Sequence, residues 1–232
     1  PAAGSESSPG SVITKEEGQL KRAVNADCLF PRFSVLNPER CYTLPPAQIA
    51  NGVTDIMCHL QERYFTNSKP VEFTDRLIEA TLRTVIATAP RVLANPTSYD
   101  DWAELMWAGT IAHNELLNTG RVGDWASHDI EHELSALYDI AHGAGLAIIT
   151  PAWMKYTLRH DIARFAQYAE RVWRVEDNYF DPERVAREGI ARLEAFWRSR
   201  LLMEKLTQWG ISCRFGQSIS KLSIGLPCKC CA

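Results

Sequence analysis

The histidines of this chain are concentrated in one stretch. Residues 124–143, DWASHDIEHELSALYDIAHG, carry His128, His132 and His142, three of the six histidines in the sequence. Residues four apart stack on one face of a helix, so His128 and His132 project together. The apolar residues fall on the opposite side of the same helix; they are Ile130, Leu134, Leu137 and Ala141. If that apolar side is the buried one, the histidine side is either a set of ligands or a solvated face.

A second pair of potential ligands lies upstream, in the sequence TDIMCH. Asp55 and His59 are also four residues apart and share a helix face. One carboxylate and three neutral imidazoles suit Fe²⁺ or Zn²⁺, and they would leave a net positive site that polarises a bound oxygen. His128 and His142 would be about 21 Å apart on a continuous helix. Both can therefore bind one ion only if the chain bends before His142, and the glycines that follow predict a helix end there.

Each pair also has an ordinary structural interpretation, because such pairs occur on many solvated helices. Because both pairs and a later histidine occur in one helical domain, a metal site and ordinary solvated faces are equal alternatives. His113 and His160 fit no cluster, so we expect local packing for His113 and exposure for His160. Cys58 points about 100° away from His59 and is not expected to bind the same ion. The tryptophans, including Trp125, are expected in the core.

Composition excludes several classes of function. The net charge of −3 and the pI of about 6.1 provide no basic field for a nucleic-acid backbone. No apolar run approaches the roughly 20 residues that span a bilayer, and no signal peptide is recognisable. The seven cysteines form no evenly spaced framework, which indicates a reducing cytoplasm. The terminal CKCC could bind a soft metal or act in redox chemistry, but it lacks the second half of a zinc-ribbon spacing.

The patterns divide the chain into three parts. Residues 1–45 are β-rich, with expected strands at SVIT and RFSVL around a charged turn, and residues 46–211 are helical. Residues 212–232 lose periodicity and form an atypical tail without an assigned function. Pro1 stands where an initiator Met would be, so we expect a chain cut from a longer one. The expected helices begin at Pro46 and then cover residues 72–93, 99–117, 124–143, 143–160, 161–173 and 181–202.

Three apolar stripes predict the residues that face the core. The first helix contributes Ile49, Val53, Ile56, Met57, Leu60 and Tyr64. The second contributes Leu77, Ala80, Thr81, Val85 and Ile86. The third contributes Trp102, Leu105, Met106 and Ile111.

Three segments also carry a resemblance to a known family. They are PAAGSES, NPERCYTLPPAQIANGVTDIMCH and the long segment from MWAGTIAHNELL to ITPAWMKY. In order and spacing they resemble the iron-containing alcohol dehydrogenases, in the NAD(P)H-dependent butanol dehydrogenase or aldehyde reductase branch. The resemblance runs from Pro1 to about Phe196. It implies the helical metal-binding domain of the dehydroquinate synthase-like fold, preceded by a β-rich remnant of the nucleotide-binding domain whose Gly-rich phosphate loop is absent.

The resemblance implies a site and a reaction. Asp55, His59, His128 and His142 would hold Fe²⁺ or Zn²⁺, and His132 would sit near substrate and nicotinamide as a candidate proton relay. The reaction would be hydride transfer between NAD(P)H and a primary alcohol or aldehyde, in a homodimer. Two other functions stay open: a non-catalytic metal-binding fragment without a cofactor domain, and a mononuclear metal hydrolase, for which no general base is evident.

The resemblance further implies that the first loop lines the nucleotide site. Its expected cofactor-binding residues are Ala3, Gly4, Ser5 and Ser8, since a Gly/Ser loop offers N–H groups and hydroxyls to a phosphate. The family often has Thr where Ala3 stands, so this chain lacks one hydroxyl. Most Gly/Ser loops are only loops, which is the alternative for this segment.

Overall fold

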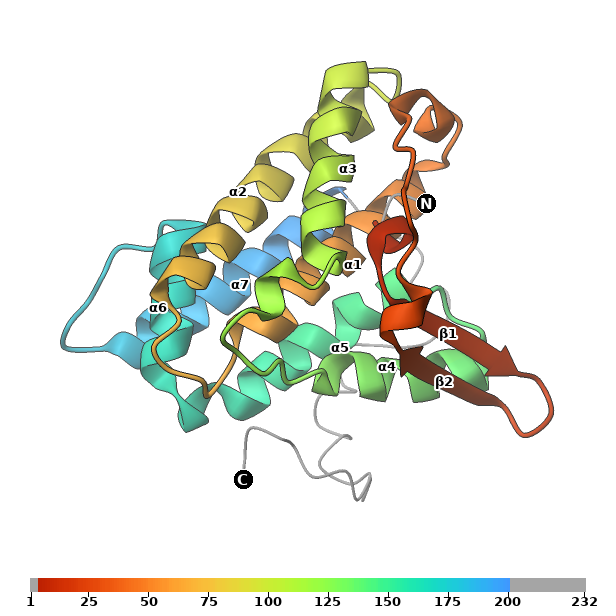
Figure 1. Ribbon diagram of the computed structural model, residues 1–232. Helices are drawn as coiled ribbons and strands as arrows, with labels where there is room; N and C mark the ends of the chain where they lie inside the picture. The colour runs from red at the N-terminus through yellow and green to blue at the C-terminus, as the bar shows by residue number, and fades with distance from the viewer. Residues whose placement is uncertain (1–3, 201–232) are drawn as a thin grey trace.

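The computed structural model describes residues 4–200, and Figure 1 shows a bundle of helices with a β-hairpin at one side. The helices are α1 (Pro46–Tyr64), α2 (Glu72–Ala94), α3 (Tyr99–His113), α4 (Ala126–Tyr138), α5 (His142–Thr157), α6 (Ile162–Trp173) and α7 (Pro182–Arg200). Short 3₁₀ turns are η1 (Ser5–Ser7), η2 (Asp27–Leu29), η3 (Pro38–Cys41), η4 (Leu116–Asn118) and η5 (Leu158–His160). Within the described part of the chain, no helix is long and apolar enough to cross a bilayer.

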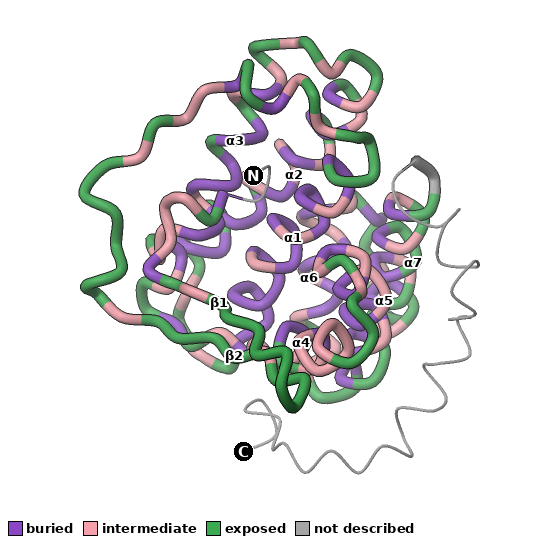
Figure 2. The backbone as a smooth tube through the Cα atoms, turned by 90° about the vertical axis from the view of Figure 1, so that its right-hand side faces the viewer, coloured by how far each residue is buried: buried purple, intermediate pink, exposed green. Residues whose placement is uncertain are grey.

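The chain is mainly helical with a short two-stranded sheet, as the sequence predicts. Strand β1 (Gly10–Lys15) pairs antiparallel with β2 (Leu20–Asn25), around the expected charged turn. The predicted strand RFSVL is wrong: residues 32–36 form no strand, and Phe33 is 81% exposed. A tight turn lets β2 pair with β1 locally, whereas RFSVL meets no strand edge among residues 4–200. Figure 2 shows the hairpin as an exposed arm.

Helix α1 is the centre of the bundle and explains where the site lies. Every residue of its predicted stripe is buried, and it packs against α2, α3, α4 and α5. Pro46 occupies the first turn, where its missing N–H costs nothing. Because neighbours cover α1 on several sides, its polar residues are enclosed as well. A polar group in that position needs a partner, which is the first indication of a site.

Helix α2 faces the core with a different set of residues from the one predicted. Leu77 and Ala80 are exposed, and Thr81 and Ile86 are half-buried. The residues that are buried follow a regular spacing of three and four; they are Ile78, Leu82, Val85, Ala89 and Val92. The helix is rotated because it packs on α1, α3 and α6 together. In α3, Trp102, Leu105 and Met106 are buried as predicted, while Ile111 is half-buried.

The histidine stretch forms two helices rather than one. Helix α4 ends at Tyr138, Asp139 has a left-handed φ of 52°, and His142 is the first residue of α5. The predicted bend before His142 is therefore present, but His142 belongs to the following helix and not to the end of α4. The buried side of α4 is also the opposite of the one predicted: Ser127, His128 and Glu131 are buried, whereas Leu137 is 51% exposed.

The remaining helices agree with their sequence signals. Asp161 caps α6 by accepting from Arg164 N at 3.0 Å, and Asp181 accepts from Arg184 N at 3.0 Å before α7. Not every tryptophan is in the core, since Trp107 is 60% exposed. The division at residues 45 and 211 stays a prediction. The tail at 212–232, with its CKCC motif, lies outside the described residues, as does Ala3.

Candidate metal centre

Helices α1, α4 and α5 bring one carboxylate and three imidazoles together. Nε2 of His59 and of His128 each lie 3.6 Å from Asp55 Oδ1, and Nε2 of His142 lies 3.5 Å from it. These separations are longer than good hydrogen bonds, which centre near 2.9 Å. They match the spacing of atoms that share an ion about 2.0 to 2.2 Å from each. Three helices thus converge on one carboxylate oxygen.

The same atoms lack ordinary partners, which is the test of whether they fit a metal. Asp55 Oδ1 and His128 Nε2 are buried without a hydrogen-bond partner among the described residues. Native proteins rarely leave such atoms unsatisfied, so an unpaired buried acceptor calls for a ligand. The potential ligand atoms of Asp55, His128 and His142 lie within 4.8 Å of one another. A carboxylate and imidazoles are also the donors that Fe²⁺ and Zn²⁺ accept. The residues fit a divalent metal.

Two buried glutamates orient the imidazoles, and sequence analysis missed both. His128 Nδ1 is 3.1 Å from Glu62 Oε1, and His142 Nδ1 contacts Glu131 Oε2. The side chains of Glu62 and Glu131 are 2% and 0% exposed. Since a carboxylate accepts, each Nδ1 carries a proton, which leaves Nε2 as the nitrogen that faces Asp55 and can bind a metal once its own proton is displaced. Their positions, seven residues after Asp55 and three after His128, were signals in the sequence.

His59 is held from its other side by Arg63 and Trp125. Arg63 Nη1 donates to His59 O at 2.9 Å, and its guanidinium lies 4.6 Å above the Trp125 ring. The Trp125 ring meets the ring of His59 edge-on, with centroids 5.3 Å apart. Burial lowers the pKa of Arg63 to about 10, which leaves it charged at neutral pH. Trp125 is half-buried and belongs to this site rather than to the core.

The charges of the centre are strongly coupled. Burial alone would raise the pKa of Asp55, but the imidazoles of His128 and His142 hold it well below its usual range. Burial alone would lower the pKa of His128, but Asp55 and Glu62 raise it to about 9. Burial and neighbouring imidazoles keep the pKa of His59 well below its usual range. Asp55 is therefore anionic, and a metal would displace protons from the ligands that carry them.

His132 lies at the edge of the centre. Its ring centroid is 5.3 Å from that of His142 and 6.4 Å from that of His128, and its side chain is half-buried. Burial and the charge of His142 lower its pKa to about 4, so the ring is neutral near pH 7. Cys58, as expected, points elsewhere: its Sγ is 3.3 Å from Thr150 Oγ1. His160 is exposed, also as expected.

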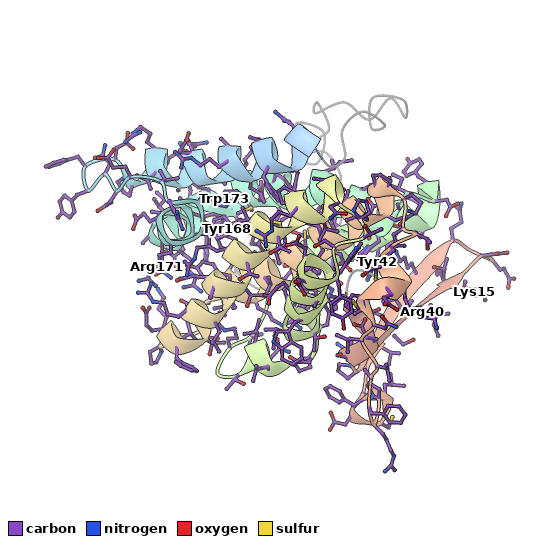
Figure 3. The ribbon with its side chains drawn as sticks, turned by 90° about the horizontal axis from the view of Figure 1, so that it is seen from above. Lys15, Arg40, Tyr42, Tyr168, Arg171 and Trp173 are labelled. Atoms are coloured by element: carbon purple, nitrogen blue, oxygen red, sulfur yellow. The ribbon has the colours of Figure 1, made fainter. Side chains whose placement is uncertain are left out.

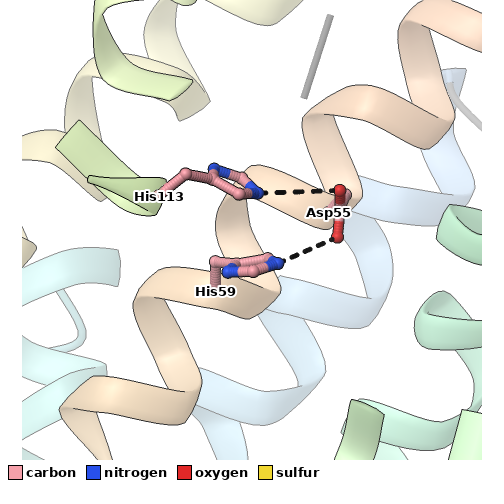
Figure 4. Close-up of side chains that lie close together, drawn as sticks. All are labelled: Asp55, His59 and His113. Carbon is pink, nitrogen blue, oxygen red and sulfur yellow. Dashed lines mark ion pairs between the residues drawn. The ribbon is translucent and has the colours of Figure 1, made fainter. Parts of the chain in front are cut away.

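His113 is packed locally, as expected, with Nδ1 2.9 Å from Gly109 O, but the prediction that it fits no cluster is wrong. It is 3% exposed at the end of α3, and its Nε2 lies 3.9 Å from Asp55 Oδ2 (Figure 4). Its ring packs on that of His59 with centroids 3.8 Å apart. The histidine that fitted no cluster is therefore a member of this one. No spacing in the sequence reveals it, because only the packing of α3 on α1 brings His113 to Asp55.

The first loop packs on α3 close to His113. Gly4 has a φ of +94°, and a Cβ there would lie 2.3 Å from the carbonyl carbon and oxygen of Gly109. Only glycine fits so close an approach. Ser5 is exposed, while Ser8 Oγ accepts from Gly10 N at 2.9 Å. The loop is therefore one helical turn from the metal centre, with the hydroxyl of Ser8 already engaged within the loop.

Comparison with known proteins gives the family. The C-terminal profile of the Fe-containing alcohol dehydrogenase family matches residues 49–223, which goes beyond Phe196, where the resemblance was expected to end. This chain belongs to the Fe-containing alcohol dehydrogenase family. The probable NADH-dependent butanol dehydrogenase 1 of Bacillus subtilis is 42% identical over 211 residues, 91% of this chain and 54% of that protein.

Two further relatives of the Fe-containing alcohol dehydrogenase family support the same fold. The NADPH-dependent aldehyde reductase YqhD of Escherichia coli is 38% identical over 96% of this chain and 56% of its own length. The crystal structure of NADH-dependent butanol dehydrogenase A from Thermotoga maritima superposes with a TM-score of 0.85 at 37% identity, covering 94% of this chain and 54% of that one. The chain thus spans about half the length of the relatives it matches.

Proposed function

We propose that this chain carries the metal-binding half of a butanol dehydrogenase-like alcohol dehydrogenase or aldehyde reductase. The reaction would transfer hydride between NAD(P)H and a primary alcohol or aldehyde. The observation that supports it is the buried, unpaired Asp55 Oδ1 facing three imidazole nitrogens at 3.5 to 3.6 Å. The names of the relatives, butanol dehydrogenases and an aldehyde reductase, suggest the substrate class.

In this proposal Asp55, His59, His128 and His142 hold Fe²⁺ or Zn²⁺. The ion, when bound, supplies a Lewis acid that polarises the oxygen of the substrate. Glu62 accepts from Nδ1 of His128, and Glu131 accepts from Nδ1 of His142. Both imidazoles are thereby kept in the tautomer that presents Nε2 to the ion. Burial of His128 against α1 keeps water from that side of the site, which strengthens every charge interaction within it.

His132 is the candidate proton relay. Its neutral ring lies beside His142, so one ring nitrogen can accept a proton from a substrate hydroxyl or return one to it. The cofactor would supply the hydride and the remaining redox chemistry. Ala3, Gly4, Ser5 and Ser8 are proposed to line its site, because Gly4 packs on Gly109 of α3, one turn from His113. A homodimer in the cytoplasm is the proposed setting.

Metal uptake by the purified chain tests the ligand set. We expect the wild-type chain to bind about one equivalent of Fe²⁺ or Zn²⁺. Asp55→Asn and His59→Ala should each lower the affinity by at least about 10-fold, because each removes a donor from a buried cluster. His160→Ala is the control, since His160 is exposed, and it should bind like wild type. An Asp55→Asn chain with full affinity would contradict the assignment.

A metal-binding chain without catalysis is the second candidate, because the chain spans about half the length of its relatives. Titration of NADPH in the presence of Zn²⁺, followed by nicotinamide fluorescence, separates the two. Saturable binding that depends on the loop supports the dehydrogenase, with Gly4→Ala expected to abolish it by displacing the loop from Gly109. Metal uptake without nucleotide binding supports the second candidate.

A further inference from the structure

His113 presents a free lone pair to the centre. Its Nδ1 lies 2.9 Å from the carbonyl oxygen of Gly109. A carbonyl only accepts, so Nδ1 is the protonated nitrogen, and in the neutral ring Nε2 has an unshared pair. Metal-binding histidines usually donate their second N–H to a carbonyl or carboxylate in this way. His113 therefore has the orientation and tautomer of a ligand.

The partner that faces this lone pair is a carboxylate oxygen. His113 Nε2 and Asp55 Oδ2 are 3.9 Å apart, in a site where the histidine is 3% exposed. Two acceptors that face each other inside a protein repel unless something positive lies between them. A separation of 3.9 Å is too long for a hydrogen bond, yet it suits two ligands about 2.0 to 2.2 Å from one ion.

His59 faces the other oxygen of the same carboxylate, with its Nε2 3.6 Å from Asp55 Oδ1. The potential ligand atoms of Asp55, His59 and His113 are all within 4.8 Å of one another, and Figure 4 shows both rings directed at the carboxylate. The turn that carries His113 is also fixed, because Gly4 packs directly on Gly109.

We propose that His113 is a further ligand to the metal, binding through Nε2 on the Oδ2 side of Asp55. This inference rests on the proposed metal-binding role of Asp55. His59 and His113 form one group with Asp55, and His128 and His142 form a second group with the same carboxylate. The proposal joins the two groups at Asp55, so that four imidazoles and one carboxylate bind the ion, one donor more than the sequence indicated. Zn²⁺ in proteins is mostly four-coordinate, so a fifth protein donor favours ions that accept more ligands, such as Fe²⁺ or Co²⁺.

The experiment uses the full 232-residue chain with Co²⁺ as a coloured probe and Zn²⁺ as a competitor. His113→Leu removes the donor, and His113→Gln keeps an N–H for the Gly109 carbonyl while removing the imidazole. In both we expect Co²⁺ affinity to fall by about 10-fold or more, and Zn²⁺ affinity to fall less. We also expect the visible absorption of Co²⁺ to become more intense, as it does when coordination drops from five to four. Thr110→Val, on the same turn, should change neither quantity.

X-ray absorption on the wild-type Co²⁺ chain provides a readout that needs no variant. Four imidazoles in the first coordination sphere support the proposal, and three would overturn it. An unchanged Co²⁺ spectrum in His113→Leu or His113→Gln would overturn it too. These failures differ from that of the proposed function, in which the wild-type chain itself would take up no Co²⁺ and Asp55→Asn would have nothing to lose.

Discussion

At the scale of single residues, the centre depends on hydrogen bonds behind the ligands. Glu62 Oε1 accepts from both Nδ1 and the backbone N–H of His128, each at 3.1 Å. It therefore fixes the ring orientation and the start of α4 together. Glu131 accepts from Nδ1 of His142 across the bend between α4 and α5. The ligands are only as well placed as these two buried carboxylates.

Replacing Glu62 by Gln tests this arrangement. The amide has nearly the same shape but no charge, so it accepts a weaker hydrogen bond from Nδ1 of His128 and makes the imidazole a weaker metal ligand. We expect metal affinity to fall by about 10-fold while the fold is kept. Glu133→Gln is a matched control on α4, because Glu133 is 45% exposed and pairs with Arg22. Competition with a coloured chelator measures both variants, and equal affinities for the two would contradict the role of Glu62.

At the scale of elements, the centre requires α5 to approach α1 closely. A Cβ at Gly143 would lie 2.2 Å from Asn51 O and 2.6 Å from Asn51 C. Both are backbone atoms of α1, which cannot rotate away as a side chain can. Gly143 follows His142 directly, so any displacement there moves a ligand. The close contact between α5 and α1 therefore also fixes the position of His142, the proposed metal ligand.

Gly143→Ala should therefore weaken both stability and metal binding. We expect a loss of about 1 to 3 kcal/mol in the free energy of unfolding, typical of overpacking. Gly189→Ala is the control, because its Cβ would meet Ala169 Cβ at 2.5 Å in the contact between α6 and α7. That variant should lose stability in denaturant titration and keep its metal affinity. A Gly143→Ala chain that loses stability alone would show that α5 has room to move.

At the scale of the whole molecule, an ion-pair cluster joins distant segments at the C-terminal end of α1. The side chain of Asp75 on α2 is 3% exposed and accepts from Arg121 Nη2 at 2.9 Å and from Arg164 Nη2 at 2.7 Å. Arg164 also donates to the backbone of Tyr64 at the end of α1. Nearby, Arg171 of α6, marked in Figure 3, pairs with Glu72 of α2. The cluster fixes α2 and α6 against the central helix.

The stability of the molecule should therefore depend on pH through Asp75. Burial alone would raise the pKa of Asp75, but Arg164 and Arg121 hold it below its usual value. A depressed pKa stabilises the fold fully above about pH 4, the value of the unfolded chain, and this contribution is lost as pH falls through the folded value. Asp75→Asn should cost about 3 to 5 kcal/mol at pH 7.

The difference in the free energy of unfolding between wild type and Asp75→Asn should then become smaller below about pH 4. Urea titrations at pH 7 and at successively lower pH values measure it. Asp100→Asn serves as the control, because Asp100 is exposed and its substitution should change stability by no more than about 0.5 kcal/mol. A difference in unfolding free energy between wild type and Asp75→Asn that stays constant down to the lowest pH at which the chain folds would contradict this prediction.

The sequence by itself determined the local features of this protein. Helical spacing placed Asp55 with His59 and predicted the bend that lets His142 join His128, and Pro46 marked the start of α1. Periodicity also indicated the mainly helical fold, and the resemblance of three segments indicated the family that the match over residues 49–223 confirms. These properties follow from neighbours in the chain, since helix periodicity and turns depend on residues only a few positions apart.

Only the tertiary structure decided which faces are buried and which distant residues meet. The apolar side of α4 looked like the buried one, but packing on α1 and α5 buries His128 and Glu131 instead, where Glu62 pairs with His128 and His142 pairs with Glu131. His113 and Glu62 entered the centre by the same route, through contacts between helices far apart in sequence. Periodicity in the sequence defines the two sides of a helix, and the elements that pack against the helix determine which side is buried.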